Sequence, residues 1–335
     1  MKISVEGRPQ EMRALWYEGG KVVMIDQRLL PNTFKLVTFT TCSEVAASIK
    51  DMTVRGAPAI GVAAAYGMLL ATKDGSKLDD AAKMLKATRP TAHDLFFAVD
   101  SMMESIRAGK NPEEAARSYA DAIIEKCRRI GEYGEPLIKD GANVMTHCNA
   151  GALATVDYGT ALAPMRVAWN KGKKMFVYVS ETRPRLQGMK LTAYELLNEG
   201  IPHAIIPDGA SGHFMREGVD VVIVGADRIA SNGDFANKIG TYEKAVLAKE
   251  LGIPFYTAAP ISTFDFSIED GKQIPIEDRS EDEVTMIDGH RIAPEGCRAL
   301  NPSFDMTPNR YVTGIITEIG VIKPNEVGKV RRMLK

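Results

Sequence analysis

The hydrophobic positions divide the chain into two parts with different spacing. In the first forty residues, apolar and polar residues alternate, and "RALWYE", a Gly-Gly turn and "KVVMID" predict a β-hairpin. From about residue 43 to 139 the apolar spacing is helical, with start signals at Pro58, in the first turn of "AIGVAAAYGMLLA", and at Asn111 before "PEEAARSYADAIIEKCRRI". This part is predicted to be a small sheet with helices.

Beyond about residue 141, short apolar runs alternate with helical segments. The runs are "NVMTH", "KMFVYVS", "HAIIP", "DVVIVGA" and "PFYTAA". Apolar strands separated by helices predict a parallel, doubly wound sheet. We therefore predict an α/β protein, with a smaller N-terminal domain of a short β-sheet plus helices (residues 1–135) and a Rossmann-like parallel-sheet C-terminal domain (residues 136–335).

The composition is that of an ordinary globular protein. The 335 residues are 45% hydrophobic and 25% charged, with a formal net charge of -1, so no global positive field would attract nucleic acid or an anionic membrane. The longest apolar stretch, residues 57–71, is broken by Pro58 and two glycines and is too short for a membrane span. The N-terminus is too polar for a signal peptide, and the four cysteines lack zinc spacing. We expect a cytoplasmic protein with free thiols and no metal.

Polar side chains follow several of the predicted strands. They are His147, Cys148 and Asn149; Glu181, Thr182 and Arg183; Asp208; and Asp227 and Arg228. In a parallel sheet, ligands bind beyond the carboxyl ends of the strands, so we expect the functional site there. The chain has no GxGxxG after a strand and no GxxxxGK[ST], which leaves a dinucleotide or P-loop cofactor site without its main support.

Two of these strand-end residues are candidates for catalysis. Cys148 is either a small hydrophobic residue or a reactive thiol whose pKa is lowered by a helix that begins near Ala150. A dyad with His147 is not expected, because adjacent residues of a strand point to opposite faces. Asp227 follows the apolar run "VVIVGA", which predicts a raised pKa and a general acid. The alternative for Asp227 is a helix N-cap or an ion pair with Arg228.

Four turns carry groups suited to a phosphate and to hydroxyls. In "RGAPAIG", Arg55 and the backbone of Gly56 and Ala57 open an apolar helix. The others contribute Arg89 in "TRPT", Gln187 in "ETRPRLQG", and Asn237 and Lys238 at the start of another predicted helix. One such turn alone is better explained as a capped helix with an exposed arginine, but together they indicate a bound phosphate. The charged stretch "EDGKQIPIEDRSEDEV", residues 269–284, is predicted to be a solvated surface loop.

Taken together, the motifs resemble a known family. "RGAPAIG", "TRPT", "THCNAGALAT", "ETRPRLQG", "LTAYEL", "VGADRIASNGDFANKIGTY" and "NPSFDMTP" resemble the 5-methylthioribose-1-phosphate isomerases, over about residues 10–322. These sugar-phosphate isomerases are related to regulatory subunits of the eukaryotic translation-initiation guanine-nucleotide exchange factor. The resemblance implies a homodimer without metal or organic cofactor. It implies catalysis by Cys148 and Asp227, and it implies that the substrate is bound by Arg55, Arg89, Gln187, Asn237 and Lys238.

The reaction that the resemblance implies is an aldose–ketose isomerisation in methionine salvage, from 5-methylthio-α-D-ribose 1-phosphate to 5-methylthio-D-ribulose 1-phosphate. The segment "IPDGASGHFM", residues 206–215, departs from the family pattern, so 5-deoxyribose 1-phosphate is a further candidate substrate. Two alternatives remain. A ribose-1,5-bisphosphate isomerase is disfavoured by "RGAP", where those enzymes carry "RGAA"-like segments. A non-catalytic regulatory-subunit-like binding protein is disfavoured by the presence of both Cys148 and Asp227.

Overall fold

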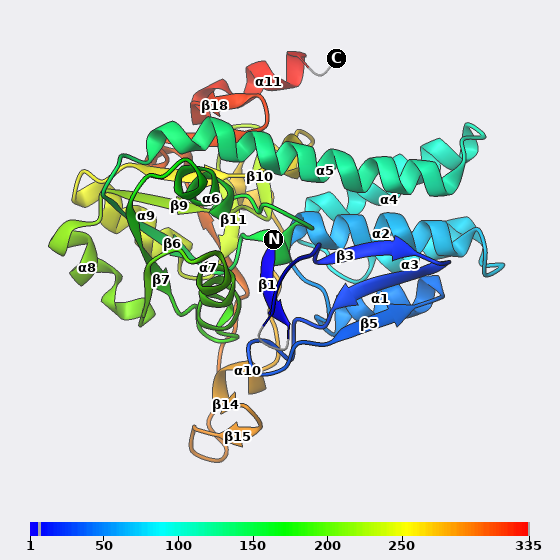
Figure 1. Ribbon diagram of the computed structural model, residues 1–335, viewed down its shortest axis with the longest axis horizontal. Coiled ribbons are helices and arrows are strands. Elements are labelled where there is room, and N and C mark those ends of the chain that lie inside the picture. The colour runs from blue at the N-terminus through cyan, green and yellow to red at the C-terminus, as the bar shows by residue number, and fades with distance from the viewer. Residues whose placement is uncertain (6–7, 334–335) are drawn as a thin grey trace.

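The computed structural model describes residues 1–5 and 8–333, and its first part is built on short antiparallel strands (Figure 1). β1 (Lys2–Val5) pairs with β2 (Arg8–Glu11). β3 (Leu15–Glu18), β4 (Lys21–Ile25) and β5 (Leu36–Phe39) form an antiparallel sheet in that order. The β3–β4 pair is the hairpin that the alternating pattern predicts.

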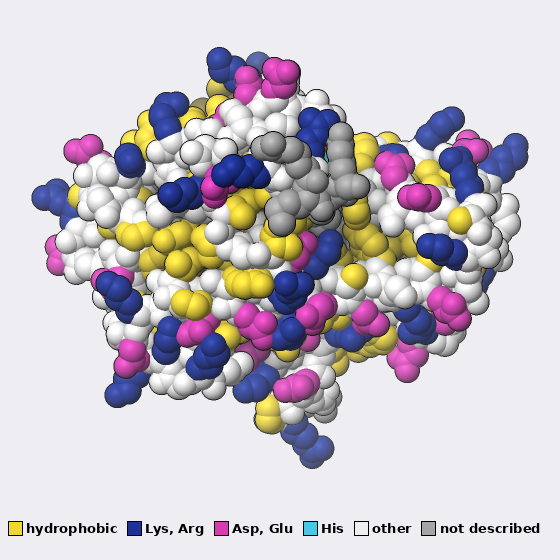
Figure 2. Space-filling model, turned by 90° about the horizontal axis from the view of Figure 1, so that it is seen from above, with side chains coloured by type: hydrophobic (Ala, Val, Ile, Leu, Met, Phe, Trp, Pro, Cys, Tyr) yellow, Lys and Arg dark blue, Asp and Glu magenta, His cyan; other side chains and the backbone are white. Residues whose placement is uncertain are grey.

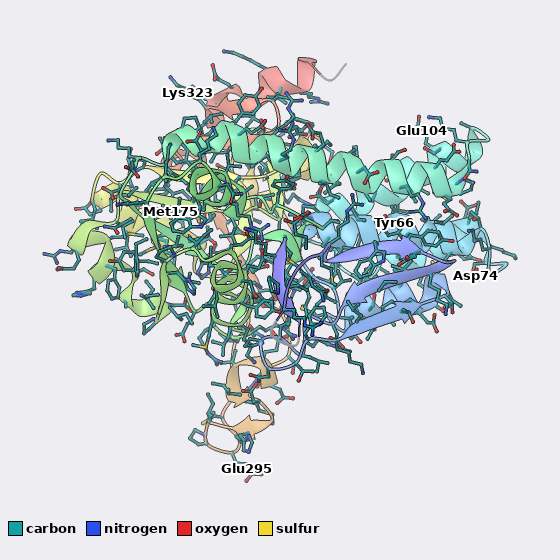
Figure 3. All side chains as sticks on the ribbon, in the orientation of Figure 1. Tyr66, Asp74, Glu104, Met175, Glu295 and Lys323 are labelled. Atoms are coloured by element: carbon teal, nitrogen blue, oxygen red, sulfur yellow. The ribbon has the colours of Figure 1, made fainter. Side chains whose placement is uncertain are left out.

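Five helices pack beside this sheet. They are α1 (Cys42–Lys50), α2 (Ala57–Ala71), α3 (Leu78–Lys86), α4 (His93–Arg107) and α5 (Pro112–Gly134). Every residue of α2 is buried, as expected for a helix that is apolar on all sides. Tyr66 of α2 stacks on Tyr17 of β3 with ring centroids 5.9 Å apart, which joins the helices to the sheet (Figure 3). The predicted helix starts at Pro58 and at Asn111 are confirmed.

The second part is organised by a seven-stranded sheet. Its strands lie in the order β18-β17-β12-β9-β6-β7-β8, and every neighbouring pair is parallel except β17–β18. The bounds are β6 (Ala142–His147), β7 (Met175–Ser180), β8 (His203–Ile206), β9 (Val221–Val224), β12 (Phe255–Ala258), β17 (Gly314–Thr317) and β18 (Gly320–Ile322). The six parallel strands have the 3-2-1-4-5-6 order of doubly wound sheets, so the chain reverses direction across the sheet between β6 and β9.

Helices accompany this sheet and confirm the predicted α/β class. They are α6 (Leu162–Asn170), α7 (Ala193–Glu199), α8 (Ser211–Gly218), α9 (Thr241–Glu250), the short α10 (Asp282–Thr285) and α11 (Val327–Met333). The long helix α5 packs on α2 and α4 and also on α6 and β17, so it spans both parts of the molecule (Figure 1). A domain boundary at residue 135, just after α5 ends, stays a prediction.

A small mixed sheet lies at the carboxyl edge of the large one. Its order is β13 (Phe264–Asp265), β10 (Arg228–Ala230), β11 (Phe235–Lys238) and β16 (Phe304–Thr307). The prediction that Asn237 and Lys238 begin a helix is wrong, because both belong to β11 and α9 begins only at Thr241. Gly240 takes a φ of +97° between the two elements and turns the chain.

Two surface features complete the description. The hairpin of β14 (Met286–Ile287) and β15 (His290–Arg291) projects away from the body of the molecule (Figure 1). Basic and acidic side chains are interspersed over the face in Figure 2, in keeping with the small net charge. Within residues 1–5 and 8–333, no helix combines the length and the apolarity needed to cross a membrane.

Candidate functional site

One cavity lies where β6 and β9 end, at the point where the strand order reverses. It encloses about 580 Å³ of empty space, including the part open to solvent, and Cys148 and Asp227 both line it. All seven predicted substrate-binding residues line it as well: Arg55, Gly56, Ala57, Arg89, Gln187, Asn237 and Lys238. The fold therefore brings together groups that come from both parts of the chain, at the position where doubly wound sheets bind ligands.

Cys148 occupies the turn directly after β6. Its φ of +62° is unusual for a residue with a side chain, and such strain persists only where neighbours hold it. Here the Cys148 N–H donates to Oγ1 of Thr182 at 2.8 Å, and its carbonyl accepts from Oγ1 of Thr192 at 2.7 Å. The His147 ring instead lies with Nε2 2.8 Å from the carbonyl oxygen of Ile239. The thiol is thus presented to the cavity without His147 as its partner, as the strand geometry predicts.

The expectation of a helix N-terminus at Ala150 is wrong. Only a single 3-10 turn, Ala152–Ala154, follows, and α6 begins at Leu162. The carboxylate of Glu195 stabilises this turn by accepting hydrogen bonds from the N–H groups of Ala152 at 2.7 Å and Leu153 at 3.2 Å. Without a helix dipole, burial dominates and raises the pKa of the Cys148 thiol, although Arg55 and Lys238 act in the opposite direction. A raised pKa favours the thiol over the thiolate at neutral pH.

Arg55 is buried and fixes the turn that carries Cys148. Its Nε donates to Oε1 of Gln27 at 3.1 Å, its Nη1 donates to the carbonyl oxygen of Asn149 at 2.9 Å, and its Nη2 donates to the Asn149 side chain. The Asn149 amide in turn donates to Glu195 at 2.9 Å. Sequence reasoning assigned no role to Gln27 or Glu195. The signal for Glu195 was present in the "LTAYEL" motif, whereas Gln27 stands in no motif.

Asp227 lies between β9 and β10, and its N–H donates to the carbonyl oxygen of Ala236 at 2.9 Å. Burial raises the pKa of this carboxyl against the opposing effects of Lys238 and Arg89, as the apolar run before it predicts. The alternative ion pair with Arg228 is not formed, because Arg228 Nη1 lies 3.6 Å from Oδ2 of Asp265. A carboxyl group in this setting can hold and donate a proton.

Part of the cavity wall is cationic. Lys238 Nζ donates to the Ser303 carbonyl at 2.7 Å and lies 4.4 Å from the Phe304 ring centroid. Burial and the neighbouring Arg279 lower the pKa of Lys238 to about 8. In the described part of the chain, Arg89 Nε and Nη1 and Gln187 Oε1 are buried without a hydrogen-bond partner. Buried polar atoms of this kind are costly, so they mark positions that an anionic, hydroxyl-bearing ligand would satisfy.

Asp208, another residue that follows a predicted strand, does not line the cavity. It accepts the N–H groups of Thr182 at 2.9 Å and Arg183 at 2.7 Å, so it shapes the turn after β7. Within the described residues, no group of three or more His, Cys, Asp or Glu side chains is arranged to hold a metal ion.

The prediction that residues 269–284 form a solvated loop is wrong for its central part. The side chain of Arg279 is only 12% exposed and lines the cavity, and that of Glu277 is 13% exposed. A charge-rich stretch carries no local sign of burial, because what buries these side chains is a cavity wall built from residues far away in the sequence.

Gly56 is a glycine of the cavity wall that leaves no room for a side chain. Its φ is +97°, and a Cβ atom there would lie 2.5 Å from the backbone of Ala154. We expect Gly56→Ala to reduce the free energy of unfolding by more than about 2 kcal/mol, since it combines strain with overpacking. Gly75→Ala is the matched control, because Gly75 has a φ of +79° with nothing within 4 Å. Equal losses of thermal midpoint in the two variants would contradict the close contact.

Comparisons with known proteins show the family to which the chain belongs. The chain belongs to the initiation factor 2 subunit family, whose model matches residues 53–324. The chain is 52% identical to the methylthioribose-1-phosphate isomerase of Roseiflexus castenholzii over 345 residues, which cover 96% of this chain and 98% of the relative. The family resemblance inferred from the motifs is confirmed.

Two solved structures share the fold. The 5-methylthioribose 1-phosphate isomerase of Pyrococcus horikoshii is 43% identical, with a TM-score of 0.87 over 97% of this chain and 96% of that one. The delta subunit of translation initiation factor eIF-2B from A. fulgidus is 40% identical, with a TM-score of 0.82 over 97% of this chain and 99% of that one.

Proposed function

We propose that the chain is an aldose–ketose isomerase that converts 5-methylthio-α-D-ribose 1-phosphate to 5-methylthio-D-ribulose 1-phosphate in methionine salvage. One observation carries the proposal: Cys148 and Asp227 follow neighbouring strands and line the same cavity as Arg89 and Gln187, whose buried polar atoms lack a hydrogen-bond partner in the described residues. The names of the relatives that match nearly the whole chain support the same substrate.

The chemistry explains why an acid is needed. An aldose with phosphate on its anomeric oxygen cannot open to a free aldehyde, so ordinary enediol isomerisation is blocked at the first step. The bond between C1 and the ring oxygen must break while C1 keeps its phosphate. Burial favours the protonated form of Asp227 by raising its pKa, and in that form the carboxyl gives its proton to the ring oxygen and leaves positive charge at C1.

Cys148 then acts at C1 and C2 by one of two routes. In the first, the thiolate removes the C2 proton and a proton is later delivered to C1. In the second, hydride passes from C2 to C1, and Cys148 relays the proton that leaves the 2-hydroxyl. The raised pKa of the thiol favours the second route, since a resting thiol is a poor base and a bound phosphate adds negative charge that opposes ionisation. A cavity that excludes water also favours hydride transfer.

Phosphorus NMR tests the proposed function directly. Incubation with 5-methylthioribose 1-phosphate is expected to replace the substrate resonance by that of the 1-phospho-ketose. In deuterated water, hydride transfer leaves C1 without solvent deuterium, whereas deuterium at C1 excludes a pure hydride shift. An unchanged spectrum would contradict the proposed isomerase activity and favour a non-catalytic binding protein of the same family.

The choice of substrate belongs to the same experiment. Turnover of the methylthio sugar and of 5-deoxyribose 1-phosphate, measured side by side, separates the two candidates. We further propose a cytoplasmic homodimer, as the resemblance implies. At the sheet edge, Ile205 of β8 is 43% exposed and Leu197 of α7 is 72% exposed, and apolar side chains left in water beside an edge strand suit an interface.

A further inference from the structure

The segment that ends in Arg279 crosses from the second part of the molecule to the first. Oγ1 of Thr91 donates to the Pro275 carbonyl at 3.0 Å, and the Thr91 N–H donates to Glu277 Oε1 at 3.3 Å. The Arg279 N–H donates to the Asn301 carbonyl at 3.0 Å and closes the base of the projecting arm, residues 280–300. Glu295 lies at the tip of this arm, which projects away from the body of the molecule (Figure 3). The contacts to Thr91 before Arg279 and the bond to Asn301 therefore fix the backbone of Arg279 at the base of the arm, next to the cavity.

One carboxylate serves two guanidinium groups here. Glu277 Oε2 lies 3.1 Å from Arg279 Nη2 and 3.5 Å from Arg89 Nε. Burial alone would raise the pKa of Glu277, but Arg89 and Arg279 lower it, so the carboxylate is ionised. With Lys238 close to Arg279 and Arg89, three cations face two acidic groups, the carboxylate of Glu277 and the buried carboxyl of Asp227. Positive charge is therefore in excess here, as suits a phosphate group.

The buried arginine nitrogens that lack a hydrogen-bond partner belong to Arg89, one of the two arginines beside Glu277. Arg55 gives a hydrogen bond from each of its three nitrogens to Gln27 or Asn149. Arg89, by contrast, has Nε and Nη1 buried without a hydrogen-bond partner in the described residues, and its Nε makes only the 3.5 Å ion pair with Glu277. The Arg279 guanidinium lies 5.6 Å from the Phe304 ring centroid, and Phe304 also lies under Lys238. Arg89, Lys238 and Arg279 therefore surround one position at which donors and positive charge are both in excess.

We propose that Arg279 binds the substrate phosphate together with Arg89 and Lys238, and that Glu277 is a positioning residue that holds the two arginines toward it. The inference rests on the proposed function for the identity of the sugar phosphate, but not for the phosphate site itself. The proposal adds Arg279, which stands in none of the family motifs, to the predicted site. It places Arg89 from the first part of the chain and Lys238 and Arg279 from the second part around the same phosphate.

Binding of inorganic phosphate, measured by calorimetry, tests this site without any turnover. Arg279→Gln is expected to weaken phosphate binding about 10- to 100-fold, which corresponds to the loss of a charged hydrogen bond. Arg279→Lys is expected to retain part of the affinity, because it keeps the charge but loses the planar fork. Arg298→Gln is the matched control, since Arg298 lies in the same arm with its side chain 84% exposed, and it is expected to bind as the wild type does. Wild-type affinity in a folded Arg279→Gln protein would overturn the proposal.

Glu277→Gln separates positioning from charge. Removing a negative charge beside an anion site would tighten phosphate binding if charge alone mattered. We expect weaker binding instead, because Arg89 and Arg279 lose the carboxylate that orients them. Tighter binding in this variant, with an unchanged thermal midpoint, would overturn the positioning role.

Steady-state kinetics with the sugar phosphate completes the test. Arg279→Gln is expected to raise KM about tenfold or more with a smaller effect on kcat, the pattern of lost uniform binding. An unchanged KM would overturn the assignment. If no variant and no wild-type protein turned over the sugar, the proposed function would fail, while the phosphate titrations would still decide whether Arg279 binds phosphate.

Discussion

Replacing Cys148 by serine is expected to lower kcat by about 10²- to 10⁴-fold while the protein remains folded. A hydroxyl is nearly the same size as a thiol but is far less acidic, so it relays or removes a proton at C1 and C2 poorly. The turn itself should survive, because it is held by backbone groups that bond to Thr182 and Thr192 and not by the sulfur. Steady-state turnover and the thermal midpoint together check the prediction.

Cys297→Ser is the matched control for this variant. Cys297 is exposed and does not line the cavity, so its replacement should leave turnover unchanged. Near-normal activity of Cys148→Ser would rule out a catalytic role for the thiol and leave Cys148 as a residue that only fills the turn.

Replacing Asp227 by asparagine is expected to cost a similar factor, about 10²- to 10⁴-fold in kcat. The amide keeps the shape of the side chain but has no proton to give to the ring oxygen. The matched control is Asp79→Asn on the distant helix α3, where the carboxylate is 73% exposed and pairs with Arg107. If Asp227→Asn kept nearly full turnover, another group would have to supply the proton.

The pH profile gives an independent test of the same role. A general acid works while it is protonated, so the rate that depends on Asp227 is present below its pKa in the folded protein and is lost as the pH rises through that value. Burial raises this pKa above the ordinary 3.8, so the loss should occur at higher pH than for an exposed aspartate. The Asn variant should lack this limb of the kcat profile. A limb that persisted unchanged in the variant would have to be assigned to another group.

Much of the architecture could be predicted from local patterns. The β3–β4 hairpin, the starts of α2 and α5, and the parallel strands of the second part follow from hydrophobic spacing and from Pro, Asn and Gly signals, which act over a few residues. The strand-end rule also located the cavity, because parallel strands must end on one edge. Asn237 and Lys238 are predicted to begin a helix but belong to β11, because they pair with Asp305 and Phe304 of β16, which lie far away in the sequence.

The residues that set the chemistry show where local patterns stop. Local patterns show that Cys148 and Asp227 follow predicted strands, and the motifs indicate the family and the expected phosphate ligands. Folding is needed to raise the pKa of Cys148 by burial, to bring Glu195 and Gln27 to its turn, and to place Arg279 in the cavity wall. The reason is physical: a pKa and the burial of a charge depend on neighbours brought together by folding, and here those neighbours lie tens to hundreds of residues away along the chain.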